Sequence, residues 1–142
     1  MILKSSKTSL TKSIMDPISD FLNSLKMASR THKESFVFPA SSIIMAIAEV
    51  LQKKGYIASA KKNKKGQEIE ITFPVSDPKG TPQITAVKRI SHLSKRVYRK
   101  AREIRPVRNG SGTAVLSTPK GVLSDTDARA GKVGGEVLFE IW

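Results

Sequence analysis

Two hydroxyls, a lysine and a glycine lie within five residues near the C-terminal end, in the segment Ser117-Thr118-Pro119-Lys120-Gly121. Hydroxyl groups donate and accept hydrogen bonds, and glycine lets a ligand approach the backbone closely. A double glycine, Gly134-Gly135, and the carboxylate of Glu136 follow a little further along the chain. These residue types at short range suit the recognition of a polyanion by its shape and its hydrogen-bonding groups.

Side chains for catalysis are scarce. The sequence has no cysteine, and its two histidines, His32 and His92, are isolated from each other, which suggests neither a metal site nor a catalytic triad. The paired carboxylates Asp125 and Asp127 are explained by the capping of a helix. We therefore expect no enzyme, no metal and no cofactor. The enzymatic alternative, a hydrolase using Ser117, requires one of the imidazoles within hydrogen-bond reach of that serine.

The sequence is strongly basic. Its 142 residues include 25 Lys and Arg against 12 Asp and Glu, which gives a net charge of +13. Residues 88–108 hold nine basic side chains and one acid, with Tyr98 among them. A basic stretch with an aromatic ring is typical of RNA or DNA binding, because the ring can stack on a base or ribose. For Tyr98 the alternative is a strand residue half buried in a sheet.

The sequence favours RNA over DNA, because it contains no recognition-helix pattern, zinc finger or basic zipper. The hydroxyls of Ser117 and Thr118 suit 2′-OH groups and base edges. Lys120 would contact phosphate, and Gly121 would let the backbone lie close to the RNA. Glu136 is the unusual member, since a carboxylate at an RNA surface is costly unless it accepts a hydrogen bond from a base amino group or a nearby N–H.

Further basic side chains extend this set. The lysines of residues 61–66 either solvate a turn or attract phosphate, and the first helix has a basic outer side that reaches Arg30. The predicted RNA-binding residues are Ser117, Thr118, Lys120, Gly121, Glu136, Tyr98, Arg96, Lys95, Arg89, Lys64 and Arg30. We expect no membrane partner, since no apolar run approaches the roughly 20 residues that span a bilayer. We also expect no small-molecule substrate.

The N-terminal half is expected to position part of the basic surface. Asp16-Pro17 predicts a helix start, with apolar residues then recurring at helical spacing to Ala28. A strand is predicted over residues 35–39, and a helix capped by Ser41 or Ser42 runs to Lys54, with Gly55 ending it. Strands over residues 56–60 and 68–74 follow, the second alternating with its isoleucines inward.

The C-terminal half is expected to be mainly β. Turn-rich residues 77–82 are the predicted linker, followed by a strand over 83–91 and a buried strand over 113–116 that leads into the 117–121 loop. Ser124 is expected to cap a short helix to about Ala130. The final strand, residues 136–142, is predicted to alternate, with Val137, Phe139 and Ile141 on one face and Leu138 on the other.

The predicted fold class is therefore α+β with two small domains. The N-terminal domain, residues 16–76, is a helix-strand-helix-strand-strand unit, and the mainly β RNA-binding domain spans residues 83–142 with one short helix. Residues 1–15 form a basic arm that lacks the apolar middle of a signal peptide. A cytoplasmic location is expected; an organellar one is less favoured, because transit peptides are more often Arg-rich and amphipathic.

Eight short motifs between Asp16 and Trp142 occur in an order and spacing typical of one family. They are Asp16-Pro17-Ile18-Ser19-Asp20, Pro39-Ala40-Ser41-Ser42, Gly55-Tyr56-Ile57, Arg89-Ile90-Ser91, Arg96-Val97-Tyr98, Leu116-Ser117-Thr118-Pro119-Lys120-Gly121-Val122-Leu123-Ser124-Asp125, Ala128-Arg129 and Val133-Gly134-Gly135-Glu136-Val137-Leu138. On these motifs the chain resembles the bacterial-type small-subunit ribosomal protein family S-eight. The Ser-Thr-x-Lys-Gly segment together with Gly-Gly-Glu is the most specific part.

The resemblance implies a structural protein that binds the central domain of the small-subunit ribosomal RNA and supports assembly of the platform. The implied partners are that RNA, neighbouring small-subunit ribosomal proteins and, in some members, the messenger of their own operon. The alternative function is a translational repressor or other structured-RNA binder acting off the ribosome. The chain departs from the family pattern at Leu93-Ser94, where Pro-Gly is common, and at Gly131, which stands one place early before Lys132.

Overall fold

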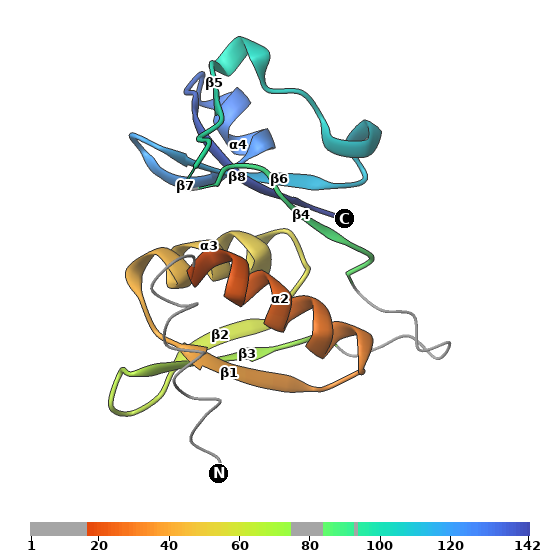
Figure 1. The fold of residues 1–142 in the computed structure, drawn as a ribbon, viewed down its shortest axis with the longest axis vertical. Helices are drawn as coiled ribbons and strands as arrows, with labels where there is room; N and C mark the ends of the chain where they lie inside the picture. The colour runs from red at the N-terminus through yellow and green to blue at the C-terminus, as the bar shows by residue number, and fades with distance from the viewer. Residues whose placement is uncertain (1–16, 75–83, 93) are drawn as a thin grey trace.

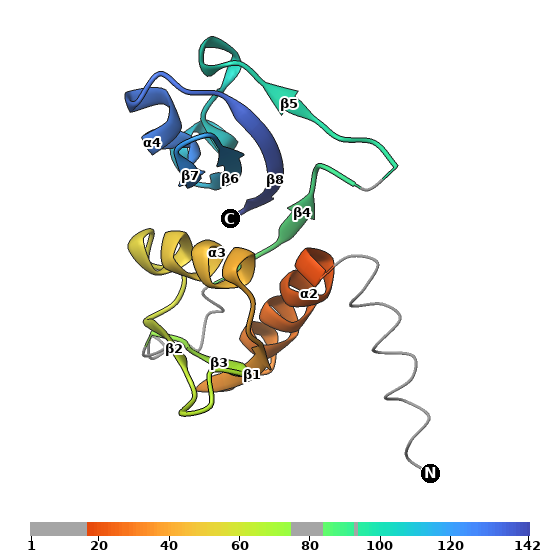
Figure 2. The same cartoon turned by 90° about the vertical axis from the view of Figure 1, so that its left-hand side faces the viewer.

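The structure is a computed structural model that describes residues 17–74, 84–92 and 94–142. The predicted N-terminal arm and the predicted 77–82 linker lie outside the described residues. Two antiparallel sheets enclose a pair of helices, and a second helical layer covers the far side of the C-terminal sheet (Figure 1, Figure 2). The α+β fold class, with a mainly β C-terminal region, is confirmed.

The N-terminal half begins with helix α2 (Pro17–Arg30) and contains helix α3 (Ser42–Lys53). Ser41 is the N-cap of α3, because its side-chain oxygen accepts a hydrogen bond from the backbone N–H of Ile44 at 3.2 Å. Most of the apolar residues that repeat at helical spacing in each helix are buried, as amphipathic patterning predicts, and the others are partly buried. Both helices therefore place their apolar faces inward, between the sheets (Figure 2).

Sheet A has the strand order β1-β3-β2. Its strands are β1 (Ser35–Pro39), β2 (Ser59–Lys62) and β3 (Glu68–Thr72). The predicted β1 and the inward isoleucines of β3 are confirmed, since Ile69 and Ile71 are fully buried. The predicted bounds of the next strand, residues 56–60, are wrong, because β2 starts at Ser59. Tyr56 instead packs between the halves, and its hydroxyl donates to the Ile141 carbonyl at 3.3 Å.

Sheet B has the order β4-β8-β6-β7, with β5 also paired to β8. Its strands are β4 (Val87–Arg89), β5 (Tyr98–Arg99), β6 (Thr113–Thr118), β7 (Gly121–Ser124) and β8 (Gly135–Ile141). The helical segments around it are two 3₁₀ turns (Ala101–Glu103 and Val107–Gly110) and α4 (Asp125–Ala130). The expected strand over residues 83–91 is thus shorter, and β6 is longer than predicted.

A β-bulge at Leu138 changes which face each β8 side chain occupies. Val115 of β6 pairs with Phe139, but the next residue, Leu116, pairs with Val137, so Leu138 has no opposite partner. Phe139 and Leu138 both enter the core shared with the N-terminal half, whereas Val137 packs on the opposite face of the sheet. The predicted alternation of Val137 and Phe139 on one face is therefore wrong, because an extra residue in one strand reverses the alternation that follows it.

The two halves share one hydrophobic core. Its fully buried members include Phe21 of α2, Leu51 of α3 and Phe139 of β8. Polar contacts reinforce it, since Lys53 forms an ion pair with Asp127 at 3.4 Å and Lys54 donates to the hydroxyl of Thr126 at 3.1 Å. A second, smaller cluster lies between sheet B, α4 and the 3₁₀ turns. Among the described residues, apolar side chains therefore pack against both faces of sheet B.

Candidate RNA-binding site

Three of the predicted site residues lie side by side at one end of sheet B. Glu136 of β8 pairs with Tyr98 of β5 on one side and with Ser117 of β6 on the other. Directly opposite residues in antiparallel strands place their side chains on the same face, a few ångströms apart. We call these three residues the polar row. Tyr98 is 65% exposed, so the alternative of a half-buried strand residue is wrong and its ring is available to a ligand.

The double glycine allows the strands of the polar row to come together. A β carbon at Gly135 would overlap the carbonyl oxygen of Ser117 and lie 3.0 Å from the α carbon of Thr118. A β carbon at Gly134 would overlap the carbonyl oxygen of Arg99 and lie 2.8 Å from the α carbon of Lys100. Any side chain at either position would push β5 or β6 away from β8. The glycines thus set the width of the polar row, which sequence reasoning alone does not show.

The Ser-Thr-x-Lys-Gly segment is a tight hairpin between β6 and β7, whereas the sequence predicts a loop that starts at residue 117. Ser117 and Thr118 are in β6, and only Pro119 and Lys120 form the turn. The Thr118 hydroxyl donates to the Gly121 carbonyl at 2.7 Å and accepts from the Lys120 N–H at 3.1 Å. Gly121 has a φ of 111°, which favours glycine. Thr118 therefore holds the turn and leaves the Lys120 side chain exposed.

Ser117 and Thr118 differ in what they can offer a ligand. Successive strand residues point to opposite faces, so Ser117 shares the face of Glu136 and Thr118 does not. The proton of the Thr118 hydroxyl is already donated to Gly121. Within the part of the chain that the structure describes, the Ser117 hydroxyl has no hydrogen-bond partner. Ser117 is thus the hydroxyl that can both donate and accept.

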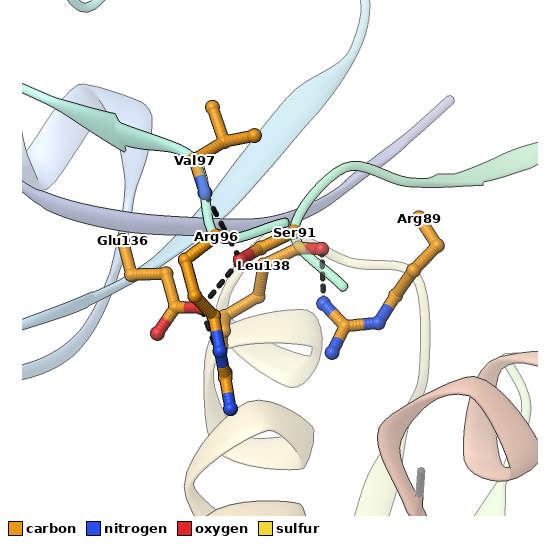
Figure 3. Close-up of polar contacts among 6 residues, drawn as sticks. All are labelled: Arg89, Ser91, Arg96, Val97, Glu136 and Leu138. Carbon is orange, nitrogen blue, oxygen red and sulfur yellow. Dashed lines mark hydrogen bonds and ion pairs between the residues drawn. The ribbon is translucent and has the colours of Figure 1, made fainter. Parts of the chain in front are cut away.

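Glu136 is held by two donors on one oxygen (Figure 3). Its Oε2 accepts a hydrogen bond from the hydroxyl of Ser91, and Arg96 Nη1 lies 3.0 Å from the same oxygen. Burial raises the pKa of Glu136, but the hydrogen bonds from Ser91 and Arg96, together with the charges of Arg96 and Arg89, lower the pKa by more. The carboxylate therefore stays ionised at neutral pH although its side chain is only 15% exposed.

The predicted basic residues of this region have different local roles. Arg89 on β4 donates from Nη1 to the Leu138 carbonyl at 2.6 Å, so it supports the bulge as well as adding charge near Glu136. Arg96 is the ion-pair partner of Glu136. Lys95 has an exposed side chain, while its backbone exchanges hydrogen bonds with His92 at 2.9 and 3.1 Å. This backbone pair forms an isolated antiparallel bridge between residues 92 and 95.

Two predicted residues are not part of this group. Lys64 is in the turn between β2 and β3, and that hairpin lies at the end of the molecule remote from sheet B in both views (Figure 1, Figure 2). Arg30 is the exposed last residue of α2. Neither side chain makes a hydrogen bond or ion pair with another described residue. Their contribution to binding stays a prediction.

An open hollow of ≈ 610 Å³ adjoins the polar row. Its lining includes charged residues that sequence reasoning did not select, namely Arg99, Lys100, Glu103 and Lys132. Glu103 Oε1 accepts from the backbone N–H of Lys100 at 2.8 Å, and this bond lowers the pKa of Glu103. Lys132 has a φ of 55°, a left-handed conformation that favours glycine. In the sequence, this strain is indicated by Gly131, which stands one position before the residue that adopts the left-handed conformation.

Three observations on the described residues concern other kinds of chemistry. Neither His32 nor His92 forms a hydrogen bond with Ser117 in the structure, although both histidines and the serine are described. Among residues 17–74, 84–92 and 94–142, no group of three or more His, Cys, Asp or Glu side chains could hold a metal ion. In the same residues, every helix is too short or too polar to cross a membrane.

Comparison with known proteins identifies the family. The model of the family "Ribosomal protein S8" matches residues 16–142. The small ribosomal subunit protein uS8 of Novosphingobium aromaticivorans is 39% identical over 127 residues, covering 89% of this chain and 97% of the relative. The uS8 proteins of Paramagnetospirillum magneticum (39%; 92% and 99% covered) and Burkholderia multivorans (41%; 89% and 96% covered) are similarly related. The chain belongs to the ribosomal protein S8 family.

Proposed function

We propose that this protein is a constituent of the cytoplasmic small ribosomal subunit that binds the central domain of the small-subunit ribosomal RNA directly and supports platform assembly. The contact surface is the polar row with the β6–β7 hairpin, surrounded by the basic residues of the 88–108 segment. Lysine and arginine side chains neutralise phosphates without selecting a sequence, so they supply affinity that falls with salt. Selectivity must come from the groups that can hydrogen-bond to bases and ribose.

The observation that carries the proposal is the side-by-side placement of Tyr98, Glu136 and Ser117. An exposed ring can stack on an unpaired base, an ionised carboxylate can accept from a base amino group or a 2′-OH, and a hydroxyl can do either. A regular helix does not present all three kinds of partner at once. The row therefore suits an irregular stem with at least one base outside the stack.

The test is a binding titration with a transcript of the ribosomal RNA central domain, set against an unrelated RNA stem of equal length. Ser117→Ala removes a hydroxyl that has no partner in the described protein, so the fold should be unaffected. We expect a loss of roughly 5- to 10-fold for the central domain, the value of one hydrogen bond, and almost none for the unrelated stem. Ser59→Ala, a serine on β2 in sheet A, is the matched control.

Equal losses for both RNAs would show that the row is not a selective site. Crosslinking in cells with sequencing of the bound RNA distinguishes the two candidate partners. Recovery of the small-subunit ribosomal RNA supports the proposal. Recovery of messenger RNA alone would instead assign the protein as a repressor acting off the ribosome, through the same residues.

A further inference from the structure

Ser91 is fully buried between the end of β4 and the start of β5, and its hydroxyl makes two hydrogen bonds. Its Oγ accepts from the backbone N–H of Val97 at 3.2 Å and donates to Glu136 Oε2. We propose that Ser91 is a positioning residue of the RNA site, which fixes Glu136 as a hydrogen-bond acceptor with one oxygen left for a donor group of the RNA. This inference rests on the proposed function.

The hydrogen-bond count around Ser91 determines the direction of each bond. A hydroxyl has one proton, and the Val97 N–H can only donate, so the Ser91 proton must go to Glu136. Arg96 is also only a donor, and it approaches the same Oε2 at 3.0 Å. Oε2 is therefore occupied by two donors. The other oxygen, Oε1, points away from both and makes no hydrogen bond to any described residue (Figure 3).

This arrangement selects the chemical group that the site accepts. An ionised carboxylate oxygen can take an N–H or O–H donor but repels a phosphate oxygen. The ligand group at Oε1 is therefore a base amino group or a ribose 2′-OH, and a phosphate is excluded from this point. Arg96 and the nearby Arg89 oppose the phosphate repulsion only in part, because Arg96 is already paired with Glu136.

Ser91 also couples Glu136 to Tyr98. The bond from Val97 to Ser91 closes the segment 91–97, and Tyr98 enters β5 immediately after it. Val97 in turn accepts a backbone hydrogen bond from the Val137 N–H at 2.9 Å, one residue beyond Glu136. One buried hydroxyl thus sets the position of the acceptor and the strand that carries the aromatic ring.

The charged surroundings of Glu136 define what a titration should report. Arg96 of the 91–97 segment and Arg89 of β4 lower its pKa, and β6 contributes only the uncharged Ser117. On the β5 side are the phenol of Tyr98 and, around the hollow, Arg99, Lys100, Glu103 and Lys132. Without the Ser91 donor, burial still raises the pKa of Glu136 with less to offset it. The carboxylate should then protonate at a higher pH.

The experiment compares Ser91→Ala with Ser124→Ala in the full chain. Ser124 is a matched control: it is also buried, and its hydroxyl accepts one backbone N–H, from Asp127 at 3.2 Å, at the N-terminus of α4. Both variants lose a hydroxyl and a comparable backbone contact. Only Ser91→Ala should raise the Glu136 pKa, measured by carboxyl ¹³C NMR in the free protein. Ser91→Cys keeps the volume with a weak donor and is the second variant if alanine prevents folding.

Binding to the central-domain transcript is then measured across pH at fixed salt. We expect Ser91→Ala to bind on the order of tenfold more weakly. As the pH is lowered, its affinity should begin to fall at a higher pH than that of the wild type. Ser124→Ala should keep the wild-type pH profile. An unchanged Glu136 pKa in both Ser91→Ala and Ser91→Cys would overturn the inference. Failure of the proposed function gives a different result. In that case Glu136→Gln would bind the central-domain transcript no more weakly than the wild type, whatever the NMR titration shows for Ser91→Ala.

Discussion

The backbone of Gly135 lies so close to the carbonyl group of Ser117 that a β carbon at Gly135 would overlap the Ser117 oxygen. β8 and β6 are therefore in contact without an intervening side chain at the position next to Glu136. This contact is between backbones, so it cannot be relieved by the rotation of a flexible side chain. The distance between Glu136 and Ser117 in the polar row depends on it.

Gly135→Ala should destabilise the protein by about 1–3 kcal/mol, since the added methyl forces the strands apart. Chemical denaturation measures the free energy of unfolding. Gly131→Ala is the control, because a β carbon there would meet its nearest neighbour, the Asp127 carbonyl oxygen, only at 3.4 Å. Equal stability of the two variants would contradict the close approach.

Lys132→Gly should stabilise the protein by about 1 kcal/mol. Lys132 has a φ of 55°, which costs a residue with a β carbon energy that glycine avoids. The variant also loses a charge at the hollow, so the double variant Gly131→Lys with Lys132→Gly is the better choice for measuring RNA binding. Thermal unfolding of both variants should show a raised midpoint, and a lowered midpoint in both would refute the strain.

Phe139→Ala should lower the unfolding free energy by about 3–5 kcal/mol and destabilise both halves together. Phe139 is fully buried in the core that includes α2 and α3. Trp142, the one tryptophan of the sequence, reports on sheet B, and far-ultraviolet circular dichroism reports mainly on the helices. The two signals should change in a single transition. Separate midpoints would mean that the halves unfold independently.

Lys64→Ala should weaken binding to the central-domain RNA and to an unrelated stem about equally. The loss of one phosphate contact should reduce the slope of log affinity against log salt by about one unit. Titrations at several salt concentrations measure this slope. Lys64→Arg, which keeps the charge, should leave it unchanged, and a selective loss with Lys64→Ala would show that the residue recognises more than phosphate.

Glu136 should stabilise the fold in a pH-dependent way. Its folded-state pKa is lowered, so its contribution is present above the unfolded-state pKa of about 4.3 and is lost as the pH falls through the folded-state value. The difference in unfolding free energy between the wild type and Glu136→Gln should accordingly shrink on acidification. A difference that is constant from neutral to acidic pH would disprove the lowered pKa.

The sequence predicts the elements whose signals are local. Ser41 and Gly55 delimit α3 because a capping hydroxyl and a terminating glycine act within a few residues of the helix ends. The alternation of β3 is similarly local, and so is the Ser124 cap of α4, whose side chain accepts from Asp127 as expected. These features follow from residues within one turn or one strand of each other.

Features that depend on distant partners could not be predicted in this way. The bulge at Leu138 reflects pairing between β6 and β8, and the assignment of Ser117 to a strand reflects its pairing with both β7 and β8. Ser91 is separated from Glu136 by 45 residues, so in the sequence it is only a serine within a basic segment. The site residues are predictable by type and motif, whereas their mutual support is visible only in the fold.

The central position of β8 has a consequence for the order in which the protein can fold during its own synthesis. Helices α2 and α3 and sheet A are complete once residue 72 has been made, whereas β8 pairs with β4, β5 and β6 and is the last of these strands to be translated. Sheet B cannot close before residues 135–141 are available, and Glu136 is among them. A nascent chain that stalls earlier therefore exposes the apolar faces of β6 and of the helices, which makes it a substrate for chaperones or proteases rather than a partial binder of RNA.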